Sequence, residues 1–135
     1  MAKRYYDSFK FKDPWFRRLR PELKCAYDYL LCDCNHAGII DIDIEDLNYR
    51  VAPKQPMTFE EIKKNFENKF VILAEETDKT GKITRMKVFI QRFIYWQYKN
   101  ELTRTNQVHR SVISILKDEG INVLPYLKNK EELEE

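Results

Sequence analysis

Glycine is scarce in this chain, which has only three glycines, Gly38, Gly81 and Gly120, each standing alone. The phosphate-binding loops of nucleotide enzymes need several glycines close together, so that backbone N–H groups can approach a phosphate. The sequence also lacks the G-x-S-x-G and H-E-x-x-H patterns of serine hydrolases and zinc proteases. We therefore expect no catalytic residue and no cofactor, and we predict that the protein is not an enzyme.

Cysteine is scarce as well, and its three positions, Cys25, Cys32 and Cys34, are an odd number. This pattern fits a reducing compartment and not a fold held by disulfides. Cys32, Cys34 and His36 suggest a metal site, but two side chains two positions apart in a helix point about 200° apart. They cannot share one tetrahedral ion. We therefore expect thiols buried in a core helix, and no metal.

Long apolar runs are missing too. No run approaches the roughly 20 residues of a membrane span. The first residues, Met1 to Asp7, lack the apolar segment of a signal peptide. We expect a cytoplasmic protein without a membrane partner.

The central part of the chain carries the clearest structural signals. Asp43 is placed to cap a short helix, and two prolines then interrupt the helical pattern. Thr58 with Glu61 forms a capping-box pattern at the start of a second helix. Strand-like runs at 70–74 and 83–90 lie on either side of turn residues. Helix, helix, strand, turn and strand is the order of elements in a winged helix-turn-helix.

Further elements are predicted on both sides of this stretch. Apolar residues at helical spacing indicate a long helix that begins at Pro21 and ends near Gly38. A short strand over 39–43 follows, and in winged-helix domains such a strand commonly pairs with the hairpin. A last helix is predicted over 106–119.

Together these elements predict an α+β fold that is mainly helical. It is a winged helix-turn-helix, with a three-helix core and a small antiparallel β-sheet with its wing, plus an additional C-terminal helix. The domain is placed at 13–121, after an N-terminal arm at 1–12 and before a polar tail at 122–135. Aromatic and basic residues alternate in the arm, which fits either an edge strand or a segment packed across the domain. Asp13 and Pro14 predict the first helical turn.

Charge is segregated along the chain, although the total is only +2. Residues 1–24 carry a net charge of +5 and residues 25–78 carry −7. Residues 79–110 carry +7 and residues 111–135 carry −3. Such segregation matters more than the total charge to a polyanionic partner. Together with the predicted winged helix, an architecture that most often meets DNA, it indicates double-stranded DNA as the partner.

The cations expected to contact DNA lie on or beside the hairpin, around the second helix of the motif, and near the N-terminus. They are Lys79, Lys82, Arg85 and Lys87; Lys54, Lys63 and Lys64; and Arg17, Arg18 and Arg20. Arg85 and Lys87 are predicted to share one face of a strand, while the apolar residues that alternate with them face the core. An ordinary solvated edge strand protected by lysine explains the hairpin nearly as well.

The second helix of the motif, over 58–68, has the position of a recognition helix. With its apolar side inward, its outward residues have a net charge of −2; they are Glu60, Glu61, Lys64, Glu67 and Asn68. Phosphates repel carboxylates, and base edges offer few partners for them. We therefore expect little sequence readout from this helix and expect the wing to make the main contacts.

Two further groups of residues have competing interpretations. Aromatic residues among arginines at 91–98 are able to stack on unpaired bases, but a core role for Phe93, Ile94 and Trp96 is favoured because the domain needs large apolar anchors. His109 lies beside an apolar stripe without a second metal ligand at a useful spacing. We interpret it as structural or exposed.

Two blocks of the chain are similar to a known family. The first consists of Asp13-Pro14-Trp15-Phe16, Leu19, Pro21, Leu30-Leu31 and Asn35-His36-Ala37-Gly38-Ile39; the second consists of Phe93-Ile94, Gln97-Tyr98, Asn106, His109, Val112, Leu116 and Gly120-Ile121. Over roughly residues 9 to 121 the chain resembles the N-terminal winged-helix domain of phage-encoded replication proteins, of the replisome-organiser or replication-initiator type. The resemblance implies binding to phage origin DNA in the cytoplasm of a bacterial host.

In fuller members of this family, further C-terminal regions recruit the host helicase-loading machinery. This chain ends soon after residue 121, so we expect no such region in it. The leading hypothesis is a phage or prophage winged-helix DNA-binding protein acting in replication initiation. The alternative is a small phage interaction module that binds or inhibits a host replication or defence protein.

Overall fold

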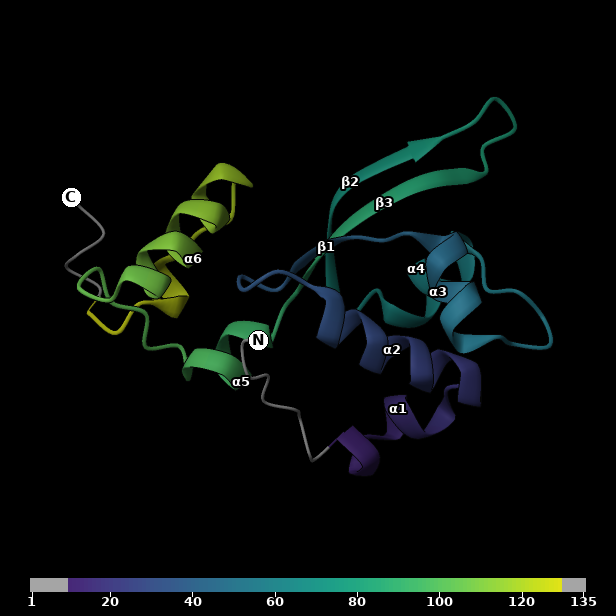
Figure 1. Cartoon of the computed structure of the whole chain (residues 1–135), viewed down its shortest axis with the longest axis horizontal. Helices are drawn as coiled ribbons and strands as arrows, with labels where there is room; N and C mark the ends of the chain where they lie inside the picture. The colour runs from purple at the N-terminus through teal and green to yellow at the C-terminus, as the bar shows by residue number, and fades with distance from the viewer. Residues whose placement is uncertain (1–9, 130–135) are drawn as a thin grey trace.

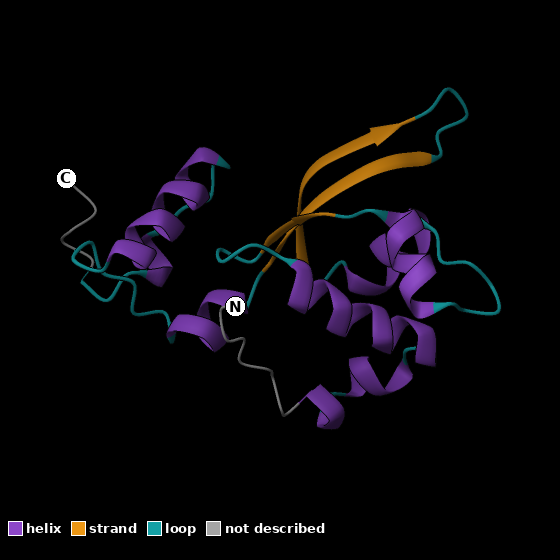
Figure 2. Ribbon diagram, viewed as in Figure 1, coloured by secondary structure: helices purple, strands orange, loops and turns teal. Residues whose placement is uncertain are grey.

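A three-stranded antiparallel sheet with helices packed around it organises the chain (Figures 1 and 2). The structure is a computed structural model and describes residues 10–129. The elements, in chain order, are η1 (Lys10–Lys12), α1 (Pro14–Arg18), α2 (Pro21–Asp33), β1 (Ile39–Asp41), α3 (Ile44–Val51), α4 (Phe59–Phe66), β2 (Phe70–Thr77), β3 (Ile83–Ile90), α5 (Phe93–Tyr98), α6 (Gln107–Asp118) and η2 (Leu124–Tyr126).

The order of these elements agrees with the predicted architecture. The chain runs α2, β1, α3, α4 and then the β2–β3 hairpin, and the strands lie in the order β1-β3-β2. β1 pairs with the hairpin strand β3, as expected for the short strand after the first long helix. The fold is therefore α+β and compatible with a winged-helix arrangement, in which the β2–β3 hairpin, hereafter the wing, extends away from the helices (Figure 1).

Side-chain caps fix where four of the helices begin. In each case a side chain just before the helix accepts a hydrogen bond from a backbone N–H in the first turn. The capping residues are Asp13 for α1, Asp43 for α3, Thr58 for α4 and Asn106 for α6. These caps confirm the predicted starts. Asp13 also accepts a hydrogen bond from Lys69, and this bond, together with the one from the Trp15 N–H, lowers the pKa of its carboxyl group.

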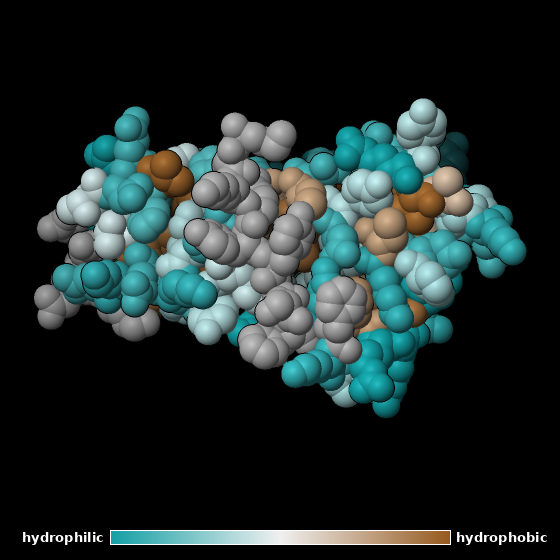
Figure 3. All heavy atoms as spheres, turned by 60° about the horizontal axis from the view of Figure 1, so that its bottom comes forward, coloured by the Kyte–Doolittle hydropathy of each residue, from teal (hydrophilic) through white to brown (hydrophobic). Residues whose placement is uncertain are grey.

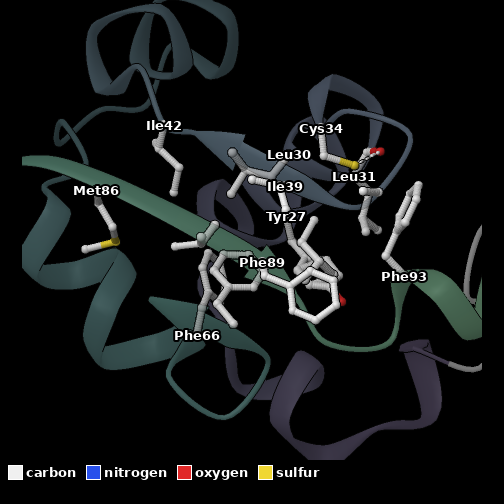
Figure 4. Packing of buried hydrophobic residues seen from close by; sticks show 14 of the residues in the cluster. Tyr27, Leu30, Leu31, Cys34, Ile39, Ile42, Phe66, Met86, Phe89 and Phe93 are labelled. Carbon is white, nitrogen blue, oxygen red and sulfur yellow. Dashed lines mark hydrogen bonds between the residues drawn. The ribbon is translucent and has the colours of Figure 1, made fainter. Parts of the chain in front are cut away.

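The core lies where α1, α2 and α4 meet the sheet. Tyr27 of α2 stacks on Phe70 of β2, with ring centroids 6.2 Å apart, and meets Phe66 of α4 edge-on. Trp15 of α1 packs edge-on against both Tyr27 and Phe66. Figure 4 shows how residues from α2, α4 and the strands converge on this cluster. Aromatic packing of this kind adds directional contacts to the area that is buried.

The central strand β3 is buried on both faces at its C-terminal end. Met86, Val88 and Ile90 are buried, as the alternation in the sequence predicts. Phe89 points to the other face and is buried too, with its ring edge-on to Tyr126 of η2. The C-terminal part of the chain therefore covers the second face of the sheet at Phe89.

The ends of the domain and one cysteine differ from the expectation. Residues 10–12 form a 3₁₀ helix and not a strand; the rest of the expected arm lies outside the described residues. Val123 and Leu127 are buried, so packing continues beyond residue 121, where we expected a polar tail. Of the two thiols expected to be buried, Cys34 is buried but Cys32 is exposed, which corrects the prediction for Cys32. Because Cys32 and Cys34 point in nearly opposite directions around a helix, both would be buried only if the helix were covered on two opposite sides.

A close backbone approach joins the start of β1 to α5. Gly38 has a φ of 82°, and a Cβ atom there would lie 2.6 Å from Cβ of Phe93. Gly120 has a similar φ of 75° but open space around it. The two glycines therefore separate the effect of backbone conformation from that of steric overlap.

We predict that Gly38→Ala lowers the free energy of unfolding by roughly 3 kcal/mol, because left-handed backbone and overpacking both cost energy there. Gly120→Ala should cost about 1 kcal/mol, from backbone conformation alone. Urea denaturation of both variants measures the difference. Equal losses would show that Phe93 does not constrain the backbone at Gly38.

His109 anchors the first turn of α6 to the segment before it. Its Nδ1 accepts a hydrogen bond from the Thr103 N–H at 3.1 Å, and its ring lies edge-on to Tyr98. Burial lowers the pKa of His109 below its ordinary value of 6.5. The ring therefore has the structural role that we predicted for it.

Since the folded state holds the neutral ring, the unfolded state binds more protons as pH falls below 6.5. The stabilisation from neutral His109 is thus complete above this pH and is lost as pH falls toward the lowered pKa. We predict that the wild type loses more stability between pH 7.5 and pH 5.5 than His109→Gln does. Urea midpoints at the two pH values test this, and an equal loss in both proteins would contradict it.

Candidate nucleic-acid interface

Helix α4, the segment before it and the tip of the wing share one continuous face. Two shallow hollows border α4, and both are lined by Glu60 and Lys64. One hollow extends to Gln55 in the segment before α4, and the other extends to Gly81 in the turn of the wing. We call this surface the wing face: residues 54–56, the outward side of α4, Glu75, and the turn 78–82.

The turn of the wing is held by its own aspartate. One carboxylate oxygen of Asp78 accepts hydrogen bonds from the Thr80 hydroxyl, the Thr80 N–H and the Lys82 N–H. These bonds, that of the Thr80 hydroxyl above all, lower the pKa of Asp78. The turn therefore presents Lys79 and Lys82 on an ordered loop, where both are exposed.

The cations in the middle of the wing lie among carboxylates. Arg85 donates hydrogen bonds to Asp41 of β1, the shorter at 2.9 Å, and also lies 3.5 Å from a carboxylate oxygen of Glu76 of β2. The hydrogen bond to Asp41 raises the pKa of Arg85. Lys87 forms an ion pair with Glu119, beyond the end of α6. The structure therefore corrects the expectation that the cations of the hairpin gather apart from the carboxylates.

The carboxylates of α4 also have partners inside the fold. Glu61 binds Arg20 through both of its oxygens, at 2.8 and 2.9 Å, so it faces α2 and not the wing. Glu60 accepts a hydrogen bond at 2.9 Å from the N–H of Ile83, the first residue of β3. Lys63 forms an ion pair with Glu75 of β2. Local sequence gives no signal for these contacts, because each joins residues 12 or more positions apart.

Six of the ten predicted DNA contacts make no ion pair within residues 10–129: Lys54, Lys64, Lys79, Lys82, Arg17 and Arg18. The four lysines belong to the wing face, which also carries the exposed Glu67. The two arginines are on α1, which Figure 1 shows at the opposite edge of the molecule from the wing. The fold therefore brings the lysines together and leaves these arginines apart.

The aromatic segment contributes mainly to the core. Phe93 and Ile94 are buried, and Trp96 is partly buried, in agreement with the favoured interpretation. Tyr95 is 43% exposed, and the cationic groups of Arg92 and Lys99 lie 5.1 and 5.6 Å from its ring centroid. This single ring is not a platform for several stacked bases.

Comparisons with known proteins do not assign a function to this face. No family model, no curated protein and no solved structure matches the chain. Between residues 10 and 129, no helix combines the length and the hydrophobicity needed to cross a bilayer. In the same part of the chain, no three metal-ligating side chains lie close enough together to hold an ion.

Glu60 is the contact that ties α4 to the wing next to its turn. We predict that Glu60→Ala makes the Ile83 amide exchange hydrogen several-fold faster, because its buried N–H loses an acceptor worth about 1 kcal/mol. Glu60→Gln keeps an acceptor oxygen without the charge and should retain most of the protection. Hydrogen exchange followed by NMR measures both. An unchanged rate in Glu60→Ala would mean that this bond does not hold the wing.

Proposed function

We propose that this chain is a winged-helix protein that binds double-stranded DNA through the wing face and acts in phage or prophage replication initiation, in the bacterial cytoplasm. The observation that carries the proposal is the position of Lys54, Lys64, Lys79 and Lys82. Lys64 lines both hollows, Lys54 precedes Gln55 of one hollow, and Lys79 and Lys82 belong to the turn that contributes Gly81 to the other. None of the four makes an ion pair with the described residues, whereas Glu61 on α4 is neutralised by Arg20.

The arrangement favours contacts to phosphates over contacts to bases. In the proposed complex, the lysines at the turn of the wing contact phosphates of one DNA strand. Lys54, before α4, and Lys64, on α4, lie beside the DNA groove. Point charges on flexible stems position a protein on the DNA backbone without reading a sequence. Four such contacts give a slope of log affinity against log salt of about −3 to −4.

The role in replication rests on the family resemblance. The segments that carry the resemblance lie in or beside α1, α2, the approach to β1, α5 and α6. A host replication protein is then a possible second partner.

A different function is favoured by one feature of the same face. The hollow between α4 and the wing is lined by carboxylates and lysines together, namely Glu60, Glu67, Glu75, Lys63 and Lys64. Such mixed lining suits a protein partner better than a polyanion. Exposed apolar side chains give this alternative less support, because hydrophobic residues occur only as separate patches on the face shown in Figure 3. Tyr49, a large residue on α3, is 85% exposed.

Reversing the charge at the turn of the wing tests the proposal. We predict that Lys79→Glu with Lys82→Glu lowers duplex affinity at least tenfold at low salt and reduces the size of the salt slope by about two. Lys12→Glu with Lys128→Glu makes the same charge change at exposed positions away from this face and should have much less effect. Fluorescence anisotropy with a labelled duplex measures all three proteins.

A further variant, measured in the same experiment, removes the carboxylate of Asp41, which binds Arg85. Asp41→Asn removes one of the two carboxylates paired with Arg85, on the sheet face opposite α4, so it should raise duplex affinity much less than the turn variant lowers it. Loss of binding to the same extent in the control pair, or absence of binding by the wild type at low salt, would reject DNA as the ligand. Capture of a host protein whose binding survives high salt and is lost in Glu67→Lys would support the alternative.

A further inference from the structure

A second group of cations lies on α6, away from the wing face. Arg110, Ser114 and Lys117 follow one another at spacings of four and three residues, which places them within about 60° of each other around the helix. Together with Arg104 and Ile113 they line an open hollow of about 310 Å³. In Figure 1, α6 and the wing lie toward opposite ends of the long axis of the molecule.

The lining of this hollow contains hydrogen-bond donors and no carboxylate. Two guanidinium groups, one ammonium group and one hydroxyl surround a single apolar side chain, Ile113. Arg110 and Lys117 make no ion pair with residues 10–129. Glu119, two residues after Lys117, is paired with Lys87. The neighbouring Asp118 is not part of the lining.

We propose that this hollow is a phosphate-binding site and that its ligand is the backbone of a nucleic acid. Arginine forks bind phosphate oxygens in bidentate fashion, and lysine and serine supply further donors around them. An acidic peptide carries the same charge, but docked peptides are usually anchored by apolar or aromatic side chains in pockets. The hollow offers one isoleucine for this purpose, which favours the nucleic-acid backbone.

The site extends the proposed function, because it gives the domain a second nucleic-acid contact that does not depend on the wing. Since the two cationic surfaces lie toward opposite ends of the domain, one protein molecule would touch nucleic acid at two separated places. Salt dependence would then reflect both surfaces, and each would contribute its own part of the slope.

The test uses the full chain and two probes, inorganic phosphate and a short DNA duplex, in NMR titrations of backbone amides. We expect the duplex at low salt to shift the signals of Arg110, Ser114 and Lys117 at concentrations where inorganic phosphate at equal ionic strength does not. Arg110→Glu with Lys117→Glu should abolish these shifts, leave the shifts of residues 79–82 in place, and reduce the size of the anisotropy salt slope by about two. Lys12→Glu with Lys128→Glu is again the charge-matched control.

The outcomes separate this site from the wing face. If the duplex shifts only the wing face, the α6 site is rejected and the proposed function stands. If the α6 double variant loses binding while Lys79→Glu with Lys82→Glu does not, the α6 site stands and the wing is not the main contact. Shifts of α6 by inorganic phosphate but not by the duplex would reject nucleic acid as its ligand. Circular dichroism of each variant establishes that it is folded.

Discussion

The pairing of β3 with strands on both of its edges is the constraint on which the rest of the structure depends. Because β3 is central, its backbone is hydrogen-bonded to β1 on one edge and to β2 on the other. Its apolar residues Met86, Val88 and Ile90 are buried against the core. Because side chains alternate between the two faces of a strand, Arg85 and Lys87 lie on the opposite face. The register then sets which residues of the neighbouring strands lie beside them: Asp41 opposite Lys87, and Glu76 opposite Arg85.

This pairing explains why charge segregation along the chain does not survive folding. The negative segment 25–78 contains β1 and β2, whereas the positive segment 79–110 contains β3. The sheet order β1-β3-β2 places the positive strand between two strands from the negative segment. Charges that are far apart in sequence therefore become neighbours, and cross-strand pairs of opposite sign are favourable. Net charge counted along a segment overestimates the positive surface whenever that segment forms the middle strand of a sheet.

The parts of the fold that follow from local chemistry were predictable. Asp43 and Thr58 cap helices because their side chains reach N–H groups within the next three residues. β3 has its predicted limits because the alternation of apolar residues begins and ends there. The interactions that shape the candidate site were not predictable in this way. Arg20 meets Glu61 across 41 positions, and the carboxylate of Glu60 reaches a backbone N–H in β3. Such contacts depend on how helices pack on the sheet, which a single sequence does not specify.

The same constraint indicates where cations remain available to a ligand. A lysine or arginine on β3 faces carboxylates supplied by β1, β2 or the end of α6, so it is largely neutralised. Lys79 and Lys82 lie in a turn beyond the last pair of strand residues, and Arg110 and Lys117 lie on a helix outside the sheet. At physiological salt, charges on the surface are screened beyond about 8 Å. Under the proposed function, these two small groups would therefore act on phosphates that are already close, and they would orient a bound nucleic acid more than attract it from a distance.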